Sequence, residues 1–268
     1  MTSEEATPAS DELMSDEEVA AKWAELAPLI DRMTARIADP NDFHVSPGST
    51  LAADDLRSSP FQVTHGARAS IVAAVDHLHA VKSLIIDHGV LHTMAPFSLL
   101  RGALENLSAA FWVLHPGDSD DRITRVLRWH GKNYNDQKKA LEARRSFDEI
   151  GFENKLAKLD DIARRCGIDP KLVRAKVFST DVVSYADKNA MKAREVLFIW
   201  QVCSGFAHGR PWAIMGTSDR TVSPTADPAV FGAQLTASMP IICWMTTVSM
   251  HLLEDVLRIY QQRAGDAA

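Results

Sequence analysis

Apolar residues recur at helical spacing along most of the chain, as expected where one face of each helix is buried. The first such stretch runs from a capping box at Ser15 and Glu18 to Pro40. Further helices are predicted over residues 67–88, 96–114, 119–147, 153–165, 170–177, 182–189, 191–208 and 229–262. Turn-forming residues in 41–66 and 209–228 indicate long connections. The pattern predicts an all-α fold, a helical bundle with long connecting loops.

The chain is predicted to form one domain behind a short tail. Residues 1–15 are acidic and polar, which is typical of a disordered tail. Residues 16–268 are assigned to a single helical domain, with the core drawn from 67–262. We identify no internal repeat and no convincing strand pattern, and only Pro211–Met215 would suit a short extended piece.

Charge and cysteine content narrow the class of protein. A net charge of −6 over 268 residues argues against broad non-specific nucleic-acid binding but leaves room for a local basic patch. The three cysteines form no CxxC pair, which favours a reducing compartment. The acidic N-terminus has none of the features of a secretory signal, so a cytoplasmic location is expected.

One uncharged segment is long enough to suggest a membrane span. Ala229–Leu253 carries no Asp, Glu, Lys or Arg, although several Thr, Ser and Gln residues and Pro240 lower its hydrophobicity. A helix buried by its own protein fits this composition better, so no membrane partner is expected.

The helix predicted over 96–114 has two distinct faces. Opposite a broad apolar face, Arg101, Glu105, Ser108 and Trp112 form a second stripe. Arg101 and Glu105 are four residues apart and can form an ion pair. Two interpretations stay open: a solvent-facing stripe, or a buried pair that sets the helix register or builds a polar site.

The helix predicted over 191–208 brings Gln201, Ser204 and His208 onto one face near its end. Gly209 is expected to stop the helix, which places His208 in a last turn whose dipole favours the protonated imidazole. His208 is therefore either a simple helix-end residue or part of a polar site with Ser204.

The helix predicted over 119–147 is rich in cations. Between residues 122 and 145 there are eight Lys and Arg but only two acidic residues. Either they form a solvated charge stripe or they make a phosphate-contacting surface, with Trp129 able to stack on a base. His130 falls on the apolar side, where Glu105 or Ser204 would be its hydrogen-bond partner.

Metal and cofactor templates are not found in the sequence. His77, His79, His88 and His92 lie close in sequence, but helical geometry separates most of them and supplies no third ligand. There is no GxGxxG, Walker, HExxH or GxSxG motif. We expect no metal and no cofactor.

The helix SLLRGALENLSAAFWVL, the Arg-rich helix after it and the Ser204–Gly209 turn resemble uncharacterised bacterial helical proteins related to the HEPN superfamily. The resemblance covers roughly residues 67–262. HEPN domains are helical bundles that often dimerise, and many are metal-independent ribonucleases in defence systems. Their active members carry an Arg and, four to six residues later, a His, and Arg125 and His130 match that spacing.

The resemblance implies that the protein binds or cleaves RNA in a defence or stress setting, through the basic face of residues 122–145, and that it forms a homodimer. His130 or His208 would be the general acid or base, and an Arg would stabilise the phosphate. These roles require one open cleft shared by three helices. The residues concerned are Arg101, Glu105, Arg125, His130, Ser204 and His208.

Two other functions fit the same sequence. The bundle would be a non-catalytic protein-interaction module if its polar centre is structural. It would be a small-ligand protein if a pocket opens between helices, lined by Trp112, Trp200, Trp212 and Trp244.

Overall fold

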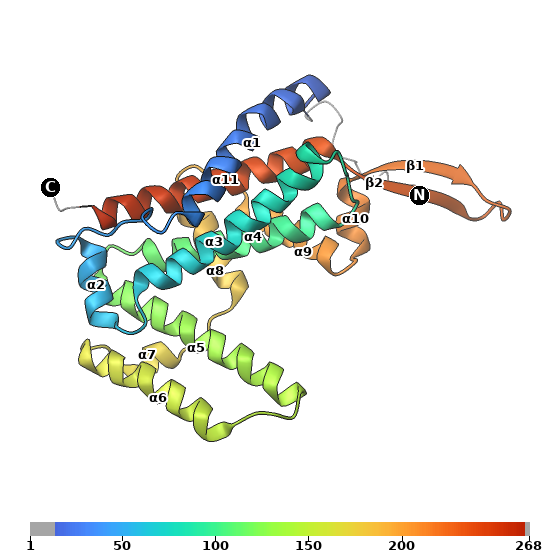
Figure 1. Cartoon of the computed structure of the whole chain (residues 1–268). Helices are drawn as coiled ribbons and strands as arrows, with labels where there is room; N and C mark the ends of the chain where they lie inside the picture. The colour runs from blue at the N-terminus through green and yellow to red at the C-terminus, as the bar shows by residue number, and fades with distance from the viewer. Residues whose placement is uncertain (1–13, 266–268) are drawn as a thin grey trace.

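The computed structural model describes residues 14–265 and confirms an all-α protein (Figure 1). The predicted tail falls mostly on residues 1–13, outside the described part. The elements in chain order are α1 (Asp16–Ala38), α2 (Thr50–Ser58), α3 (Val63–Lys82) with a π-helical extension η2 (Ser83–Asp87), α4 (Ala95–Leu114), α5 (Ser119–Ala143), α6 (Glu149–Arg165), α7 (Pro170–Arg174), α8 (Ser179–Asn189), α9 (Val196–Ala207), α10 (Pro211–Thr217), β1 (Ser218–Pro224), β2 (Phe231–Ala237) and α11 (Met239–Ala264).

Helix α4 lies at the centre of the bundle and contacts α3, α8, α9 and α11 (Figure 1). Most of its side chains are buried, from Phe97 in the first turn to Leu114 in the last. A helix that is apolar around most of its circumference is stable only when other helices surround it. The pattern of residues 96–114 predicted this helix within one residue.

Helices α5, α6 and α7 form a second layer beside the bundle (Figure 1). Helix α5 packs against α2, α3 and α4 of the bundle and also against α6 and α7. Side chains such as Leu159 of α6 and Val173 of α7 are buried in this layer. The layer is therefore tied to the bundle through α5 and, over a smaller contact, through α6 against α2.

The predicted capping box at Ser15 and the predicted stop at Gly209 are confirmed, and of the two candidate caps for α5, Asp118 and Ser119, the structure selects Asp118. The Ser15 hydroxyl accepts a hydrogen bond from the Glu18 amide, and the Glu18 carboxylate accepts one from the Ser15 amide, which completes the capping box. Asp118 accepts hydrogen bonds from two amides in the first turn of α5. Gly209 adopts the left-handed conformation just after α9, with φ +62°.

The prediction that the tract before the last helix is a loop was wrong. Strands β1 and β2 pair antiparallel as a two-stranded hairpin, and α11 begins at Met239 instead of residue 229. In β2 the apolar Phe231, Ala233 and Leu235 alternate with Gly232, Gln234 and Thr236, the period-two signal of a strand. Pro240 in the first turn of α11 marked the true helix start.

Other boundaries also differ from the prediction. The stretch 41–66 contains α2, which Ser49 caps through its hydroxyl. Pro211–Met215 is helical instead of extended, because it forms α10 after the turn at Gly209. Helix α9 begins at Val196 instead of residue 191. Such ends depend on local capping contacts that periodicity does not report.

One helix in the described part of the chain, Val63–Asp87, is long and apolar enough to cross a bilayer. This helix contacts both α1 and α4 within the bundle. The segment Ala229–Leu253, which the sequence singled out, is divided between β2 and α11. It is therefore not one continuous helix.

Candidate functional site

The predicted pair Arg101 and Glu105 forms on α4, with 3.3 Å between Arg101 Nη2 and Glu105 Oε2. Glu105 also accepts hydrogen bonds from Ser179 Oγ at 2.6 Å and from Trp200 Nε1 at 3.4 Å. The Arg101 guanidinium lies over the Trp200 ring, 5.6 Å from its centroid. The side chains are 33% and 27% exposed, so the pair lies between the solvent-facing and the buried interpretation. It connects α4 to α8 and α9.

Arg125 points from α5 towards α4 and α8. Its guanidinium lies 4.3 Å from the Tyr185 ring centroid and 5.3 Å from that of Trp112, and it donates to the Trp112 carbonyl at 2.8 Å. The Tyr185 hydroxyl lies 2.8 Å from Nδ1 of His115. Arg125 therefore holds three helices together through aromatic faces.

Arg128 has a similar structural role. It donates to the carbonyls of Ala175 and Lys176, at 3.3 Å and 2.9 Å, in the connection between α7 and α8. Burial, and next the nearby Arg125, lower the pKa of its guanidinium. Two of the cations predicted to form an exposed stripe thus pack against other elements.

His130 faces a different neighbour from Arg125. Its ring packs on Phe61, with 4.7 Å between centroids, in the connection from α2 to α3. Within residues 14–265 its Nε2 atom is buried without a hydrogen-bond partner, so neither Glu105 nor Ser204 serves as the predicted partner. Residues five apart on a helix point about 140° apart, which explains why Arg125 and His130 do not converge.

Burial lowers the pKa of His130, and this predicts acid-sensitive stability. The unfolded histidine titrates near 6.5, so below that pH the unfolded chain binds a proton more readily than the folded one. The free energy of unfolding should then fall as pH drops below 6.5. His115, whose pKa burial also lowers, adds to the same trend. Denaturant unfolding from pH 8 to pH 5 should show a shallower fall for His130→Phe than for the wild type.

The matched control is His92→Phe, because His92 is exposed in the connection between η2 and α4, away from a helix end. That variant should keep the wild-type pH dependence. If both variants follow the wild-type curve, the imidazole of His130 does not contribute to it.

Ser204 and His208 remain apart from the other predicted residues. Ser204 is half-buried on α9 and its carbonyl accepts the amide of His208 at 3.1 Å. No side-chain contact joins either residue to Arg125 or His130 in the described part of the chain. The six predicted site residues therefore lie in four places. Arg101 and Glu105 pair on α4, Arg125 packs on aromatic rings, His130 packs on Phe61, and Ser204 and His208 lie near the end of α9.

A cleft of about 870 Å³ opens between α5, α6, α7 and the start of α8. Four cations and one acid line it, together with apolar residues and Phe178, whose side chain is 59% exposed. The charged lining residues are Lys132, Asp136, Lys139, Arg174 and Lys176. Ser179 also lines the cleft and hydrogen-bonds to Glu105, so the cleft adjoins the ion pair on α4.

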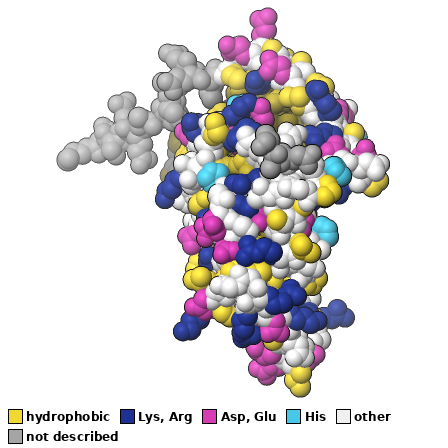
Figure 2. Space-filling view, turned by 90° about the vertical axis from the view of Figure 1, so that its left-hand side faces the viewer, with side chains coloured by type: hydrophobic (Ala, Val, Ile, Leu, Met, Phe, Trp, Pro, Cys, Tyr) yellow, Lys and Arg dark blue, Asp and Glu magenta, His cyan; other side chains and the backbone are white. Residues whose placement is uncertain are grey.

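Most of these cations have a carboxylate close by. Asp136 forms ion pairs with Lys132 at 2.6 Å and with Lys139 at 3.4 Å, and Arg174 forms one with Asp160 at 2.7 Å. One carboxylate shared by two lysines leaves an excess of positive charge. In the space-filling view, the part built by α5–α7 carries many Lys and Arg side chains mixed with Asp and Glu (Figure 2).

The tryptophans do not form one pocket. Trp112 and Trp200 are buried under arginines, whereas Trp212 on α10 is 59% exposed. Trp244 on α11 packs against Phe198. Trp129, predicted to stack on a base, is half-buried with the Lys132 ammonium 6.0 Å from its ring. Phe178 is the exposed aromatic of the cleft.

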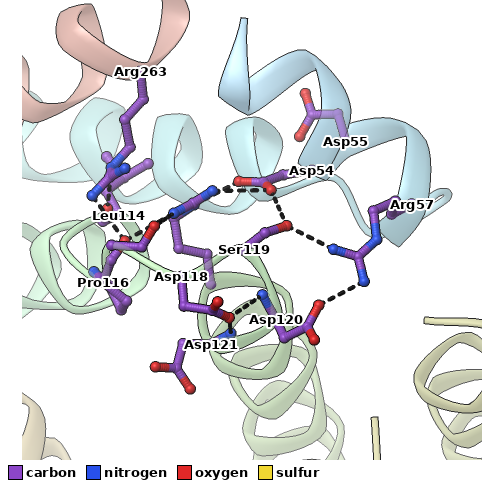
Figure 3. A network of polar contacts seen from close by, with 12 residues as sticks. Asp54, Asp55, Arg57, Leu114, Pro116, Asp118, Ser119, Asp120, Asp121 and Arg263 are labelled. Carbon is purple, nitrogen blue, oxygen red and sulfur yellow. Dashed lines mark hydrogen bonds and ion pairs between the residues drawn. The ribbon is translucent and has the colours of Figure 1, made fainter. Parts of the chain in front are cut away.

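No sequence pattern indicated the polar network between α2 and α5, whose centre is the buried pair of Asp54 and Arg122 (Figure 3). Asp54 and Arg122 form a two-point ion pair, with Nε–Oδ2 at 2.6 Å and Nη2–Oδ1 at 3.1 Å, and each side chain is 1% exposed. Arg122 also donates to the carbonyls of Pro116 and Gly117, both at 2.9 Å. Because this ion pair is closed to solvent, its role is structural. Asp54 and Arg122 are 68 residues apart in the chain, so no local sequence pattern connects them.

No group of three or more His, Cys, Asp or Glu among residues 14–265 is arranged to hold a metal ion. Comparisons with protein-family models, with curated proteins and with solved structures found no match. The functional assignment therefore depends on the geometry of the cleft.

Proposed function

We propose that the protein binds single-stranded RNA in the cleft between α5, α6, α7 and α8. The observation that carries the proposal is the combination of four cations with an exposed phenyl ring in one hollow. Proteins that bind single strands pair a basic groove for the backbone with aromatic side chains on which bases stack. The HEPN resemblance leads to the same class of ligand, through the same helix.

The lining residues have the reach that such binding needs. Lys139 is 77% exposed, so its ammonium can leave Asp136 and follow a phosphate. The backbone carbonyl of Lys176 is fixed by Arg128, while its side chain is exposed. Phe178 lies two residues after Lys176 and directly before Ser179 in the chain. Its ring can therefore stack on a base while Lys176 contacts the RNA backbone.

RNA cleavage is not part of this proposal. Neither His130 nor His208 is among the residues that line the cleft. The imidazole of His130 is packed against Phe61, and burial lowers its pKa. A general acid or base must be within hydrogen-bond reach of the reacting atoms. Binding alone is the activity that this geometry supports.

Fluorescence anisotropy with a labelled single-stranded RNA tests the proposal. The variant K139E/K176E should weaken binding by at least about tenfold, and the slope of log affinity against log salt should become shallower by about 1.4. The control K22E/K188E makes the same charge change outside the cleft lining and should bind nearly as the wild type does.

Base stacking gives a second, uncharged test. Phe178→Ala should weaken binding about 5- to 160-fold, because stacking on one aromatic ring stabilises a base by about 1–3 kcal/mol. Phe198→Ala removes a phenyl group of similar exposure, 51%, from α9 and should have little effect. A wild-type protein that binds no RNA at low salt would contradict the proposal, as would equal losses in the cleft and control variants. Single-stranded DNA and duplex RNA, run in parallel, define which nucleic acid is preferred.

A further inference from the structure

The hairpin of β1 and β2 projects away from the bundle (Figure 1) and has two unlike faces. Paired residues share a face, and successive pairs alternate between faces. The pairs Asp219–Thr236, Thr221–Gln234 and Ser223–Gly232 make one face polar. The other face carries Val222, Ala233, Pro224, Phe231 and Leu235, with Arg220 as its charged member.

The apolar face of the hairpin is uncovered. Val222 is 62% exposed and Phe231 is 69% exposed. A single two-stranded hairpin is at best marginally stable in water unless its apolar face packs on something. Within residues 14–265 no helix covers the outer part of this face at Val222 and Phe231, whereas Leu235, nearer the bundle, is half-buried. The outer part is therefore open to a partner.

An apolar groove of about 520 Å³ lies beside the base of the hairpin. Its α1 wall presents Ala20, Ala24 and Ala27, which share one face and leave room for a strand. Met239, two residues after the end of β2, lines the same groove. Trp23 also lines it, is 3% exposed, and its Nε1–H has no acceptor within residues 14–265.

We propose that this groove receives the hairpin of a second copy of the chain, in a reciprocal exchange of arms. Because the groove lies at the base of the arm, two arms placed antiparallel about a twofold axis each reach the other's groove. This inference is independent of the RNA proposal.

Charge favours a second copy over an unrelated partner. Asp16 is the charged residue of the groove lining, and Arg220 is the charged residue of the apolar hairpin face. Arg220 lies about 13 Å from Pro224, the last residue of β1, and Asp16 lies about 16 Å from Ala27 along α1. An arm seated with the end of β1 at Ala27 therefore brings Arg220 beside Asp16 of the other copy.

Sedimentation velocity on the full chain, from about 1 to 100 µM, tests the exchange because a dimer responds to concentration. The wild type should be a dimer. Phe231→Asp should raise the dimer dissociation constant by at least about a hundred-fold, since each dimer carries the change twice. Gln234→Asp adds the same charge to the polar face and should leave the dimer intact, and circular dichroism verifies that each variant is folded.

A charge exchange tests the pairing of arm and groove directly. Asp16→Arg and Arg220→Asp should each weaken the dimer, and the variant that carries both should restore it. A wild type that stays monomeric over the whole range overturns the proposal. So does a dimer that Phe231→Asp leaves intact, an equal loss with Gln234→Asp, or a double variant no tighter than the single ones.

Discussion

Replacing Asp54 with alanine is expected to lower the free energy of unfolding by about 3–5 kcal/mol, because the change leaves the Arg122 guanidinium buried without its counter-charge. Asp54 binds Arg122 through both carboxylate oxygens and also accepts a hydrogen bond from Ser119 at 2.5 Å. With the ion pair lost, Arg122 keeps only the carbonyls of Pro116 and Gly117. Urea unfolding followed by circular dichroism gives the change directly, and the melting temperature should fall by about 10 °C.

An exposed pair of equal length is the control. Arg164 and Asp161 also lie 2.6 Å apart, but their side chains are 60% and 70% exposed. Asp161→Ala should therefore change the free energy of unfolding by less than about 1 kcal/mol, because water replaces the lost partner. Similar losses for the two variants would show that burial is not what makes the Asp54–Arg122 pair important.

Phe97→Ala should cost about 3–5 kcal/mol, the range for a large aromatic ring removed from a closed core. Phe97 is fully buried in the first turn of α4 and stacks on Phe206 of α9, with 3.7 Å between ring centroids and 8° between ring planes. The same helix pair holds the Arg101–Glu105 pair against Trp200. The cavity would therefore loosen the contact that positions this pair.

Two measurements separate this effect from a general one. Phe198→Ala removes the same ring from the surface of α9, where the side chain is 51% exposed, and should destabilise by no more than about 1 kcal/mol. Hydrogen exchange should report faster opening of α4 and α9 in Phe97→Ala than in the wild type. An unchanged free energy of unfolding in Phe97→Ala would mean that the α4–α9 contact contributes little to stability.

The cations of residues 122–145 show which part of the candidate site could be predicted from the sequence and which part could not. The pattern identified α5 as the helix richest in cations, and Lys132 and Lys139 do line the cleft. It could not show that Arg125 packs on the Tyr185 ring or that Arg128 donates to a backbone carbonyl. Both uses depend on α4 and on the connection to α8, which are remote in sequence.

The all-α class, the central apolar helix, the capping box at Ser15 and the stop at Gly209 could all be predicted from the amino-acid sequence. These features depend on side-chain periodicity and on hydrogen bonds between residues three or four apart. The tertiary structure alone decided which polar groups meet. Asp54 finds Arg122, Ser179 joins Glu105, and His130 packs on Phe61 because helices distant in the chain pack side by side. Helical spacing places a residue on a face, but packing decides what that face contacts.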